Sequence, residues 1–267
     1  MKKCILFLNM LSLALAGCGK SPEPAPEDTQ RGSIVFECSV SSQVSVVASG
    51  TKADPATREL PASCLPTSEQ MALHICGCSS SFESHYETMA DYDQPLLDPG
   101  DYTIEFSYGD PEAEGPDAAC FSGTSTCTVV ARTTVTHPVV HTLANALYTV
   151  ELSDWFKNYY SEYHVSVHTE SGYQSDHTSD EETTRASTEP TPIFVKPSTK
   201  LYLSGTAVKT NGVQVEIPKT EIGTTVARTW HTIRVDAGST GQASLTLLLD
   251  DKPTAIETIE IELNPEI

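Results

Sequence analysis

Positive charge is scarce in this chain of 267 residues. Sixteen lysines and arginines stand against 36 acidic residues, which gives a formal net charge of −20. A surface of this sign repels phosphate groups, so the composition argues against nucleic acid and against anionic lipid headgroups as partners. Divalent cations are expected only as nonspecific counterions, and we predict neither a cofactor nor a metal site.

Signatures of catalysis are also missing. The sequence contains no Gly-x-Ser-x-Gly, no His-Glu-x-x-His and no glycine-rich phosphate loop with its lysine. Its many carboxylates do not single out a pair with the spacing that glycoside hydrolysis requires. We therefore predict that the chain is not an enzyme, and a hydrolase with unrecognised carboxylates is the least favoured alternative.

Long hydrophobic runs are absent as well. The apolar stretch at residues 5–16 follows two lysines and ends in Leu-Ala-Gly-Cys at Cys18. It is shorter than the about 20 residues of a spanning helix, and its flanks are those of a lipoprotein signal. We expect residues 1–17 to be removed and Cys18 to carry fatty acyl chains such as palmitate. Two chains hold a protein stably on a membrane.

The anchor is followed by a tether. Residues 18–30 contain three prolines, three acids and no large apolar side chain. Proline favours an extended, semi-rigid chain, which lifts a folded part away from the bilayer. We predict an outer-membrane location, on either the periplasmic or the cell-surface face.

Six cysteines remain after the signal and the anchor. An even number in an oxidising compartment favours disulfides, and six cysteines allow 15 pairings. Cys120 and Cys127 flank a segment with a glycine near its middle, which predicts a hairpin disulfide, while Cys64 with Cys76 or Cys78 would leave Cys38 for the remaining one. The candidates are Cys38, Cys64, Cys76, Cys78, Cys120 and Cys127.

A zinc site is the alternative for part of this set. His74, Cys76 and Cys78 share one face of a predicted strand, but same-face side chains stand roughly 7 Å apart and converge on one ion only at a bulge. Disulfides are the favoured interpretation. The pairs His137 with His141 and His164 with His168 are read as exposed strand histidines.

The folded part is predicted to be all-β, with 15 glycines and 17 prolines that suit a turn-rich protein. The clearest strand is residues 102–108, where alternation points Tyr102, Ile104, Phe106 and Tyr108 toward the core. Loops are expected at 52–70, 109–119 and 171–192, and one short helix at 155–160, capped by Ser153 and Asp154. Strands are expected at 33–40, 44–48, 71–76, 102–108, 126–131, 133–140, 143–152, 163–168, 193–195, 200–209, 213–219, 229–235, 243–249 and 255–263.

A weak internal repeat suggests two units. Residues 130–136 read Val-Ala-Arg-Thr-Thr-Val-Thr, and residues 226–232 read Val-Ala-Arg-Thr-Trp-His-Thr. Each stretch comes late in its half, as expected of a duplicated β-sandwich. We predict two tandem antiparallel sandwiches, immunoglobulin-like or transthyretin-like, at residues 31–141 and 142–267.

Several segments resemble a bacterial lipoprotein family. Residues 97–110, Leu-Asp-Pro-Gly-Asp-Tyr-Thr-Ile-Glu-Phe-Ser-Tyr-Gly-Asp, then Phe-Ser-Gly at 121–123, Leu-Ala-Asn-Ala at 143–146, Ser-Asp-Trp-Phe at 153–156 and Tyr-His-Val-Ser-Val at 163–167 are similar to the Bacteroidota proteins with domain of unknown function 4493. The resemblance covers most of the chain after about residue 32. It implies a lipid-anchored protein of two β parts, fimbrillin-like in style, and supplies no site residues. The six cysteines are a departure from it.

Together these features predict a structural, adhesive or fimbria-associated component of the cell envelope. Its partners would be the membrane, through Cys18, and other envelope proteins or glycans. The alternative is a glycan-binding accessory lipoprotein, in which exposed Tyr159, Tyr160 and Tyr173 stack on sugar faces.

Overall fold

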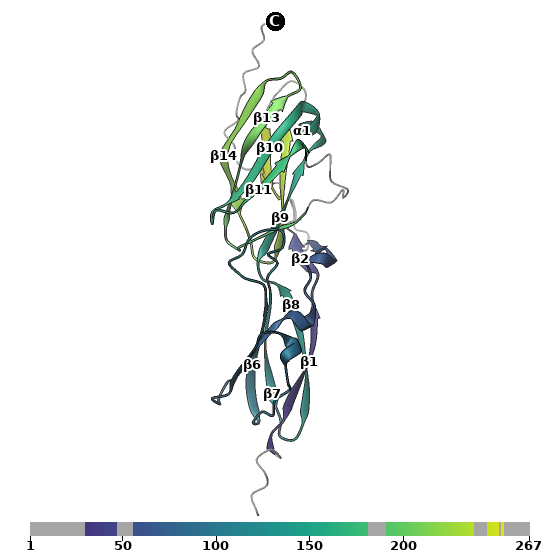
Figure 1. The fold of residues 1–267 in the computed structure, drawn as a ribbon, viewed down its shortest axis with the longest axis vertical. Helices are drawn as coiled ribbons and strands as arrows, with labels where there is room; N and C mark the ends of the chain where they lie inside the picture. The colour runs from purple at the N-terminus through teal and green to yellow at the C-terminus, as the bar shows by residue number, and fades with distance from the viewer. Residues whose placement is uncertain (1–29, 47–55, 181–190, 238–244, 251, 254–267) are drawn as a thin grey trace, which may run out of the picture.

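The computed structural model describes residues 30–46, 56–180, 191–237, 245–250 and 252–253. This part of the chain is mostly β structure arranged in three sheets, and it forms an elongated molecule (Figure 1). No helix within it is long and apolar enough to cross a membrane. The predicted signal peptide, Cys18 and most of the tether lie outside the described residues.

One end of the molecule is built on a six-stranded sheet with the order β1-β8-β7-β6-β4-β5. We call this sheet and its core the first unit. Short 3₁₀ helices η2 (Ala62–Cys64), η3 (Ser68–Gln70) and η4 (Met89–Asp91) lie in its connections. Its strands are β1 (Ser33–Val40), β4 (Ala72–Gly77), β5 (Glu83–Tyr86), β6 (Gly100–Tyr108), β7 (Phe121–Val129) and β8 (Thr134–Leu143).

Alternating side chains explain the core of the first unit. On β6 the predicted pattern is confirmed for Tyr102, Ile104 and Phe106, which are buried, whereas Tyr108 at the strand end is half-buried. On the neighbouring β4, Leu73 and Ile75 are buried beside Phe106 and Ile104. Successive side chains point to opposite faces of a strand, so one face of this sheet gathers the apolar core.

The pairing of β7 with β8 is short. Their ladder holds the pairs Phe121 with Leu143 and Ser122 with Thr142, whereas β8 pairs with β1 in parallel over eight residues. Beyond this ladder the ring of His141 lies against Gly123, where an added Cβ would be 3.0 Å from Nδ1. His141 also packs on Phe106, with ring centroids 4.7 Å apart. A buried histidine therefore fills the space where the two strands separate.

The other end, the second unit, has two sheets that share one core. The four-stranded sheet has the order β11-β10-β13-β14, and in the other sheet β9 lies between β12 and β15. Buried side chains of β9, β10, β13 and β15 form a single apolar cluster. The strands are β9 (Ala146–Leu152), β10 (Tyr160–Thr169), β11 (Gln174–Thr178), β12 (Ile193–Val195), β13 (Lys200–Lys209), β14 (Gln214–Thr224), β15 (Thr229–Ala237), β16 (Leu245–Leu249) and β17 (Lys252–Pro253).

The predicted short helix is confirmed as α1 (Asp154–Tyr159). Ser153 is its N-cap, and its hydroxyl accepts a hydrogen bond from the amide of Phe156 at 3.1 Å. Phe156 is fully buried and packs against Tyr160 and Tyr163, with ring centroids 4.8 and 5.3 Å away. The helix is thus held to the sheets by its aromatic side.

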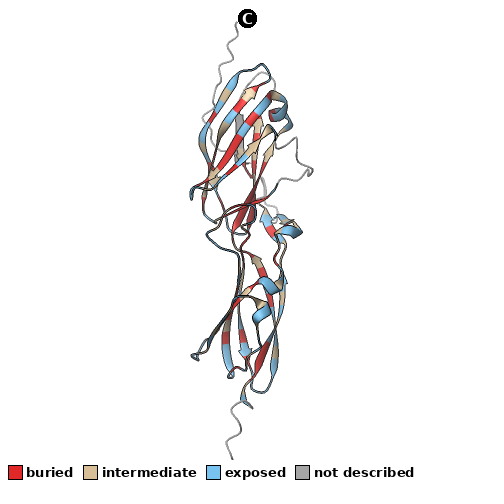
Figure 2. Ribbon diagram, in the orientation of Figure 1, coloured by how far each residue is buried: buried red, intermediate tan, exposed pale blue. Residues whose placement is uncertain are grey.

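Each unit contains strands or core residues that come from the other part of the chain. β2 (Gln43–Val46) and β3 (Ala56–Glu59) come from the N-terminal half, but β2 pairs in parallel with β15 and joins the sheet of the second unit. In return Leu147, Phe194 and Trp230 are buried in the core of the first unit. Figure 2 shows buried residues continuing through the narrow waist. The boundary between residues 141 and 142 stays a prediction.

The structure differs from the sequence reading in two predicted loops. β3 lies within 52–70 and β11 lies within 171–192. Both are polar edge segments whose extended form comes from backbone pairing with β2 and β10, not from apolar alternation. The first strand of the predicted terminal hairpin is confirmed as β16, but its partner β17 already begins at Lys252, before the predicted strand. The predicted strand at 255–263 lies outside the described residues.

The internal repeat has a matching backbone. Arg132 and Arg228 hold the same position in the two stretches and have φ angles of 61° and 59°. Each donates its amide to a carbonyl from the start of its own unit, that of Arg31 or that of Asn145, at 2.9 Å. The strand that follows, β8 or β15, then runs parallel to β1 or β9. Local conformation and strand direction therefore repeat together.

Candidate functional site at the junction of the units

The loop at residues 109–119 connects β6 to β7 of the first unit and reaches onto the second unit. Gly115 and Phe194 exchange two backbone hydrogen bonds of 2.9 Å. Gly115 has a φ of 141°, which favours glycine. A Cβ added there would lie 3.6 Å from the Tyr173 ring, so the ring packs closely over the loop. The loop is therefore docked on the second unit through its backbone.

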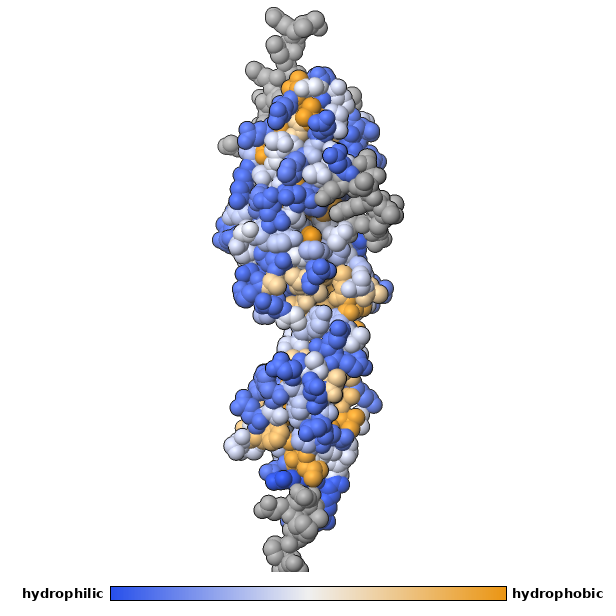
Figure 3. Space-filling view, in the orientation of Figure 1, coloured by the Kyte–Doolittle hydropathy of each residue, from blue (hydrophilic) through white to orange (hydrophobic). Residues whose placement is uncertain are grey.

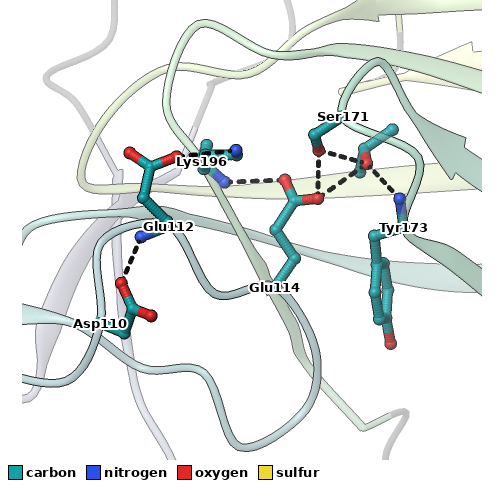
Figure 4. Close-up of polar contacts among 7 residues, drawn as sticks. Asp110, Glu112, Glu114, Ser171, Tyr173 and Lys196 are labelled. Atoms are coloured by element: carbon teal, nitrogen blue, oxygen red, sulfur yellow. Dashed lines mark hydrogen bonds and ion pairs between the residues drawn. The ribbon is translucent and has the colours of Figure 1, made fainter.

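Glu114 is the polar centre of this docking (Figure 4). Its Oε2 accepts hydrogen bonds from the hydroxyl of Thr169, at 2.8 Å, and from that of Ser171. Its Oε1 accepts the backbone amide of Lys196 at 3.2 Å. A single half-buried carboxylate thus joins three points of the second unit to the loop.

A second ion pair lies beside Glu114. The Lys196 ammonium is 3.0 Å from Glu112, whose own amide donates to Asp110 at 2.9 Å. Figure 4 shows the three carboxylates on one loop, with Glu112 and Glu114 facing Lys196 and Asp110 facing the amide of Glu112. The hydrogen bond with Glu112 raises the pKa of Lys196, with Glu114 and Asp110 adding to the rise. The ammonium is therefore held in its charged form.

A cleft of about 460 Å³ opens at the junction. Its walls come from the η2 segment, from the 109–119 loop and from the segment that leads into β12, with Tyr108 and Trp230 among the aromatic residues. Figure 3 shows apolar side chains gathered on one side of the waist, in the region where β2 lies in Figure 1. The lining residues are Pro61, Ser63, Cys64, Leu65, Tyr108, Pro116, Asp117, Ala119, Thr191, Pro192, Phe194 and Trp230.

Cys64 lies within this cleft. Burial raises the pKa of its thiol, and the Asp117 carboxylate adds to the rise, whereas a hydrogen bond with Ser63 lowers it. The cleft thus brings a thiol, a hydroxyl and a carboxylate together, and the raised pKa keeps the thiol protonated near neutral pH. This arrangement offers hydrogen-bond donors and acceptors but no activated nucleophile.

The three predicted sugar-binding tyrosines do not form one surface. The expectation that Tyr160 is exposed is wrong, because its side chain packs against Phe156 and the residue is only 3% exposed. Tyr159 is half-buried beside the Lys209 ammonium, 5.6 Å from its ring centroid. Tyr173 follows the far end of β10, about 30 Å from Tyr160 along ten strand residues. Only Tyr173 lies at the junction.

The predicted hairpin disulfide is wrong. Cys127 lies inside β7 and Cys120 directly precedes it, so a continuous strand holds the two apart. The supposed hairpin tip, Gly123, pairs with Phe106 of β6. All six cysteines of the described residues are free thiols. Strand alternation accounts for part of this, since Cys127 faces the core whereas Cys76 lies on the opposite face from Ile75.

Among the four paired histidines, His164 is exposed as predicted, whereas His137, His141 and His168 are not. His141 is fully buried, and within the described residues neither ring nitrogen has a hydrogen-bond partner. The nearby His137 is half-buried and bonds to Ser125 at 2.9 Å. His74, the supposed zinc ligand, lies 3.1 Å from both Glu105 and Glu83. No group of three metal-ligating side chains was found in the part of the chain described.

Sequence reasoning missed the junction site. It predicted the 109–119 segment as a loop, which is confirmed, but gave no role to Glu114. Acids and glycines are common in turns. Nothing in the sequence shows that Thr169 and Ser171, which lie 55 and 57 positions later, form hydrogen bonds with Glu114. The sole signal was the Gly-Pro pair at Gly115, which marks a constrained turn.

Two β units, joined by strand pairing and by a loop of the first unit that is docked on the second, define an elongated, mostly β protein. The chain belongs to the family described as domain of unknown function DUF4493, whose model matches residues 30–265. No curated protein matches this chain.

The chain is also similar, at low sequence identity, to several solved structures. A candidate polysaccharide-binding protein (DUF1812) of Bacteroides thetaiotaomicron is 10% identical with a TM-score of 0.41, covering 85% of this chain and 98% of its own. A candidate cell adhesion protein of Bacteroides fragilis is 9% identical with a TM-score of 0.41, covering 87% and 100%. A fimbrial assembly protein of Parabacteroides distasonis is 12% identical with a TM-score of 0.39, covering 70% and 91%.

Proposed function

We propose that this chain is a lipid-anchored outer-membrane protein with a structural or adhesive role, associated with fimbriae or another envelope assembly. The main support for the proposal is the position of the first strand relative to the two units. β1 begins at the end of the first unit that is far from the second unit (Figure 1). A chain held at Cys18 would therefore present its second unit away from the membrane.

The tether adds to this reach. Its 12 residues after Cys18 include three prolines, and an extended chain of about 3 Å per residue spans roughly 35 Å. The second unit would then stand beyond both the tether and the first unit. Partners in this setting are other envelope proteins or glycans that approach from outside.

The junction supports a stiff spacer. Flexible pairs of domains meet through small polar interfaces. These units instead share strand pairing and the Glu114 hydrogen bonds, and Leu147, Phe194 and Trp230 of the second unit are buried in the core of the first. Because no hinge separates the units in the described part of the chain, a pulling force applied to the second unit would reach the lipid anchor through a rigid body. This property suits a structural component better than a catalyst.

We also propose that each unit is a β-sandwich of the immunoglobulin or transthyretin kind, which would make the pair a tandem repeat. The repeated turn at Arg132 and Arg228 supports this duplication. In each unit the strand after that turn runs parallel to an early strand of the same unit. Removing either unit should then leave the other with an incomplete junction core.

Protease treatment of intact cells tests display. We expect cleavage of the full-length protein on intact cells and, in the Cys18→Ala variant, loss of the protein from the membrane fraction. A periplasmic protein in the same cells must stay uncut as the control. Protection of the chain until the outer membrane is broken would contradict surface display, and membrane retention of the Cys18→Ala variant would contradict the anchor.

A further inference from the structure

The junction cleft has the size and position of a ligand site. Its volume of about 460 Å³ lies within the range of roughly 300–1,000 Å³ that is usual for small-molecule sites, which occur preferentially between domains. The Glu114 hydrogen bonds and the Gly115 bridge hold one wall against the second unit. The cleft is therefore preformed and does not need a partner to shape it.

The chemistry of its walls is specific. Three prolines line it, and proline has no backbone N–H to offer to an extended peptide. The polar groups are instead side-chain oxygens on exposed residues, the hydroxyls of Ser63 and Thr191 and the carboxylate of Asp117. Recognition by strand addition needs a row of backbone donors, so these walls disfavour a peptide.

The charge of the cleft further restricts the class of ligand that it can bind. Asp117 is the sole charged residue among the lining residues described, and the chain as a whole is strongly acidic. A carboxylate accepts hydrogen bonds from hydroxyl groups, whereas it repels uronates, sulfates and phosphates. The guanidinium of Arg58 stacks on the Trp230 ring at 3.8 Å and is not among the residues that line the cleft.

We propose that this cleft binds a neutral oligosaccharide. The C–H face of a sugar ring packs on the half-buried Tyr108 ring and the proline rings, and its hydroxyls bond to Asp117, Ser63 and Thr191. The inference rests on the proposed function for its class of partner, since glycans are among the partners proposed there, but binding in this cleft depends on neither the lipid anchor nor surface display. Its failure would leave the protease result unchanged.

The first test measures binding to the full-length protein in a detergent without a sugar headgroup. A glycan array with neutral oligosaccharides and their uronate-containing counterparts identifies the ligand. The Trp155→Phe background, which leaves Trp230 as the one remaining tryptophan, then reports binding by fluorescence. We expect saturable binding of a neutral oligosaccharide, weakened about tenfold by Asp117→Ala. The exposed, distant Glu216→Ala is the matched control and should bind as the parent does.

Protection of Cys64 provides a measurement that does not rely on a variant. The bound oligosaccharide should slow alkylation of Cys64 by N-ethylmaleimide, followed by mass spectrometry, while exposed Cys78 reacts at an unchanged rate. A synthetic peptide of residues 21–27, rich in proline, serves as the competing ligand class. The proposal is overturned if no neutral oligosaccharide binds, if uronates or the peptide bind instead, or if Cys64 is not protected.

Discussion

His231 and Asp250 form a buried pair, with Nδ1 of the imidazole 2.7 Å from Oδ2 of the carboxylate. Their side chains are 2% and 6% exposed. The other carboxylate oxygen accepts the amide of Thr232 at 2.9 Å, and Nε2 of His231 accepts the amide of Val226, also at 2.9 Å. These bonds require the proton on Nδ1 and join the turn before β15 to the end of β16.

Asp250→Asn should destabilise the second unit by about 2–4 kcal/mol. An amide can accept from the His231 N–H or from the Thr232 N–H, but its own N–H₂ would then face the other donor. Chemical denaturation with urea measures the change. The exposed Glu216→Gln is the control and should lie within about 0.5 kcal/mol of the parent. Equal stability of the two variants would mean that the pair adds nothing.

His141 predicts a loss of stability in acid. Burial lowers the pKa of its imidazole, and no charged group contributes to the shift. In the unfolded state His141 has an ordinary pKa of about 6.5, so it binds a proton in acid before the folded state does. The contribution of His141 to the free energy of unfolding is therefore lost as pH falls through that value. His141→Leu should remove this part of the pH dependence, measured as urea stability at pH 7.5 and pH 5.

His74 supplies a control of the opposite sign for that experiment. Its hydrogen bond with Glu105 is the main cause that raises its pKa. Its contribution is therefore fully present below the unfolded pKa and is lost as pH rises through the folded pKa. His74→Gln should leave the variant less stable than the parent at pH 5 but close to it at pH 8. A His141→Leu variant that keeps the parent's acid sensitivity would contradict the assignment.

Local patterns explain what the sequence predicts correctly. The alternation on β6, the Ser153 cap of α1 and the short connection at 210–212 between the predicted strands 200–209 and 213–219 each depend on neighbours within a few residues. At that turn the amide of Lys209 donates to Val213 at 2.8 Å, and Gly212 has a φ of 84°. Such features follow from the side-chain period and from backbone propensity.

Long-range pairing explains what the sequence does not predict. β2 looks like a continuation of β1 but pairs with β15, more than 180 residues later. Glu114 likewise meets hydroxyls and an amide that only the folded junction brings near. The burial of Tyr160 did have a local signal, since Phe156 lies four positions before it and aromatic residues at that spacing pack together.

Glu114→Ala should loosen the junction. The substitution leaves the hydroxyls of Thr169 and Ser171 and the amide of Lys196 without their shared acceptor, at a cost of about 1–3 kcal/mol. Limited proteolysis should then cut within 109–119 faster than in the parent. The Glu87→Ala variant changes an exposed carboxylate away from the loop and should be cut as the parent is. Unchanged cleavage in the Glu114 variant would show that backbone pairing alone holds the loop.

Thiol labelling of the purified, unreduced protein decides between free cysteines and disulfides. Cys78 is exposed and should react first with N-ethylmaleimide, whereas Cys120 and Cys127 are buried and burial raises the pKa of both thiols. Both effects slow reaction with an electrophile, because the thiolate is the reactive form. Urea should therefore expose these two to labelling without any reductant. Labels that appear only after reduction would instead show that these cysteines are paired, in an arrangement other than Cys120 with Cys127, because the continuous strand β7 separates those two.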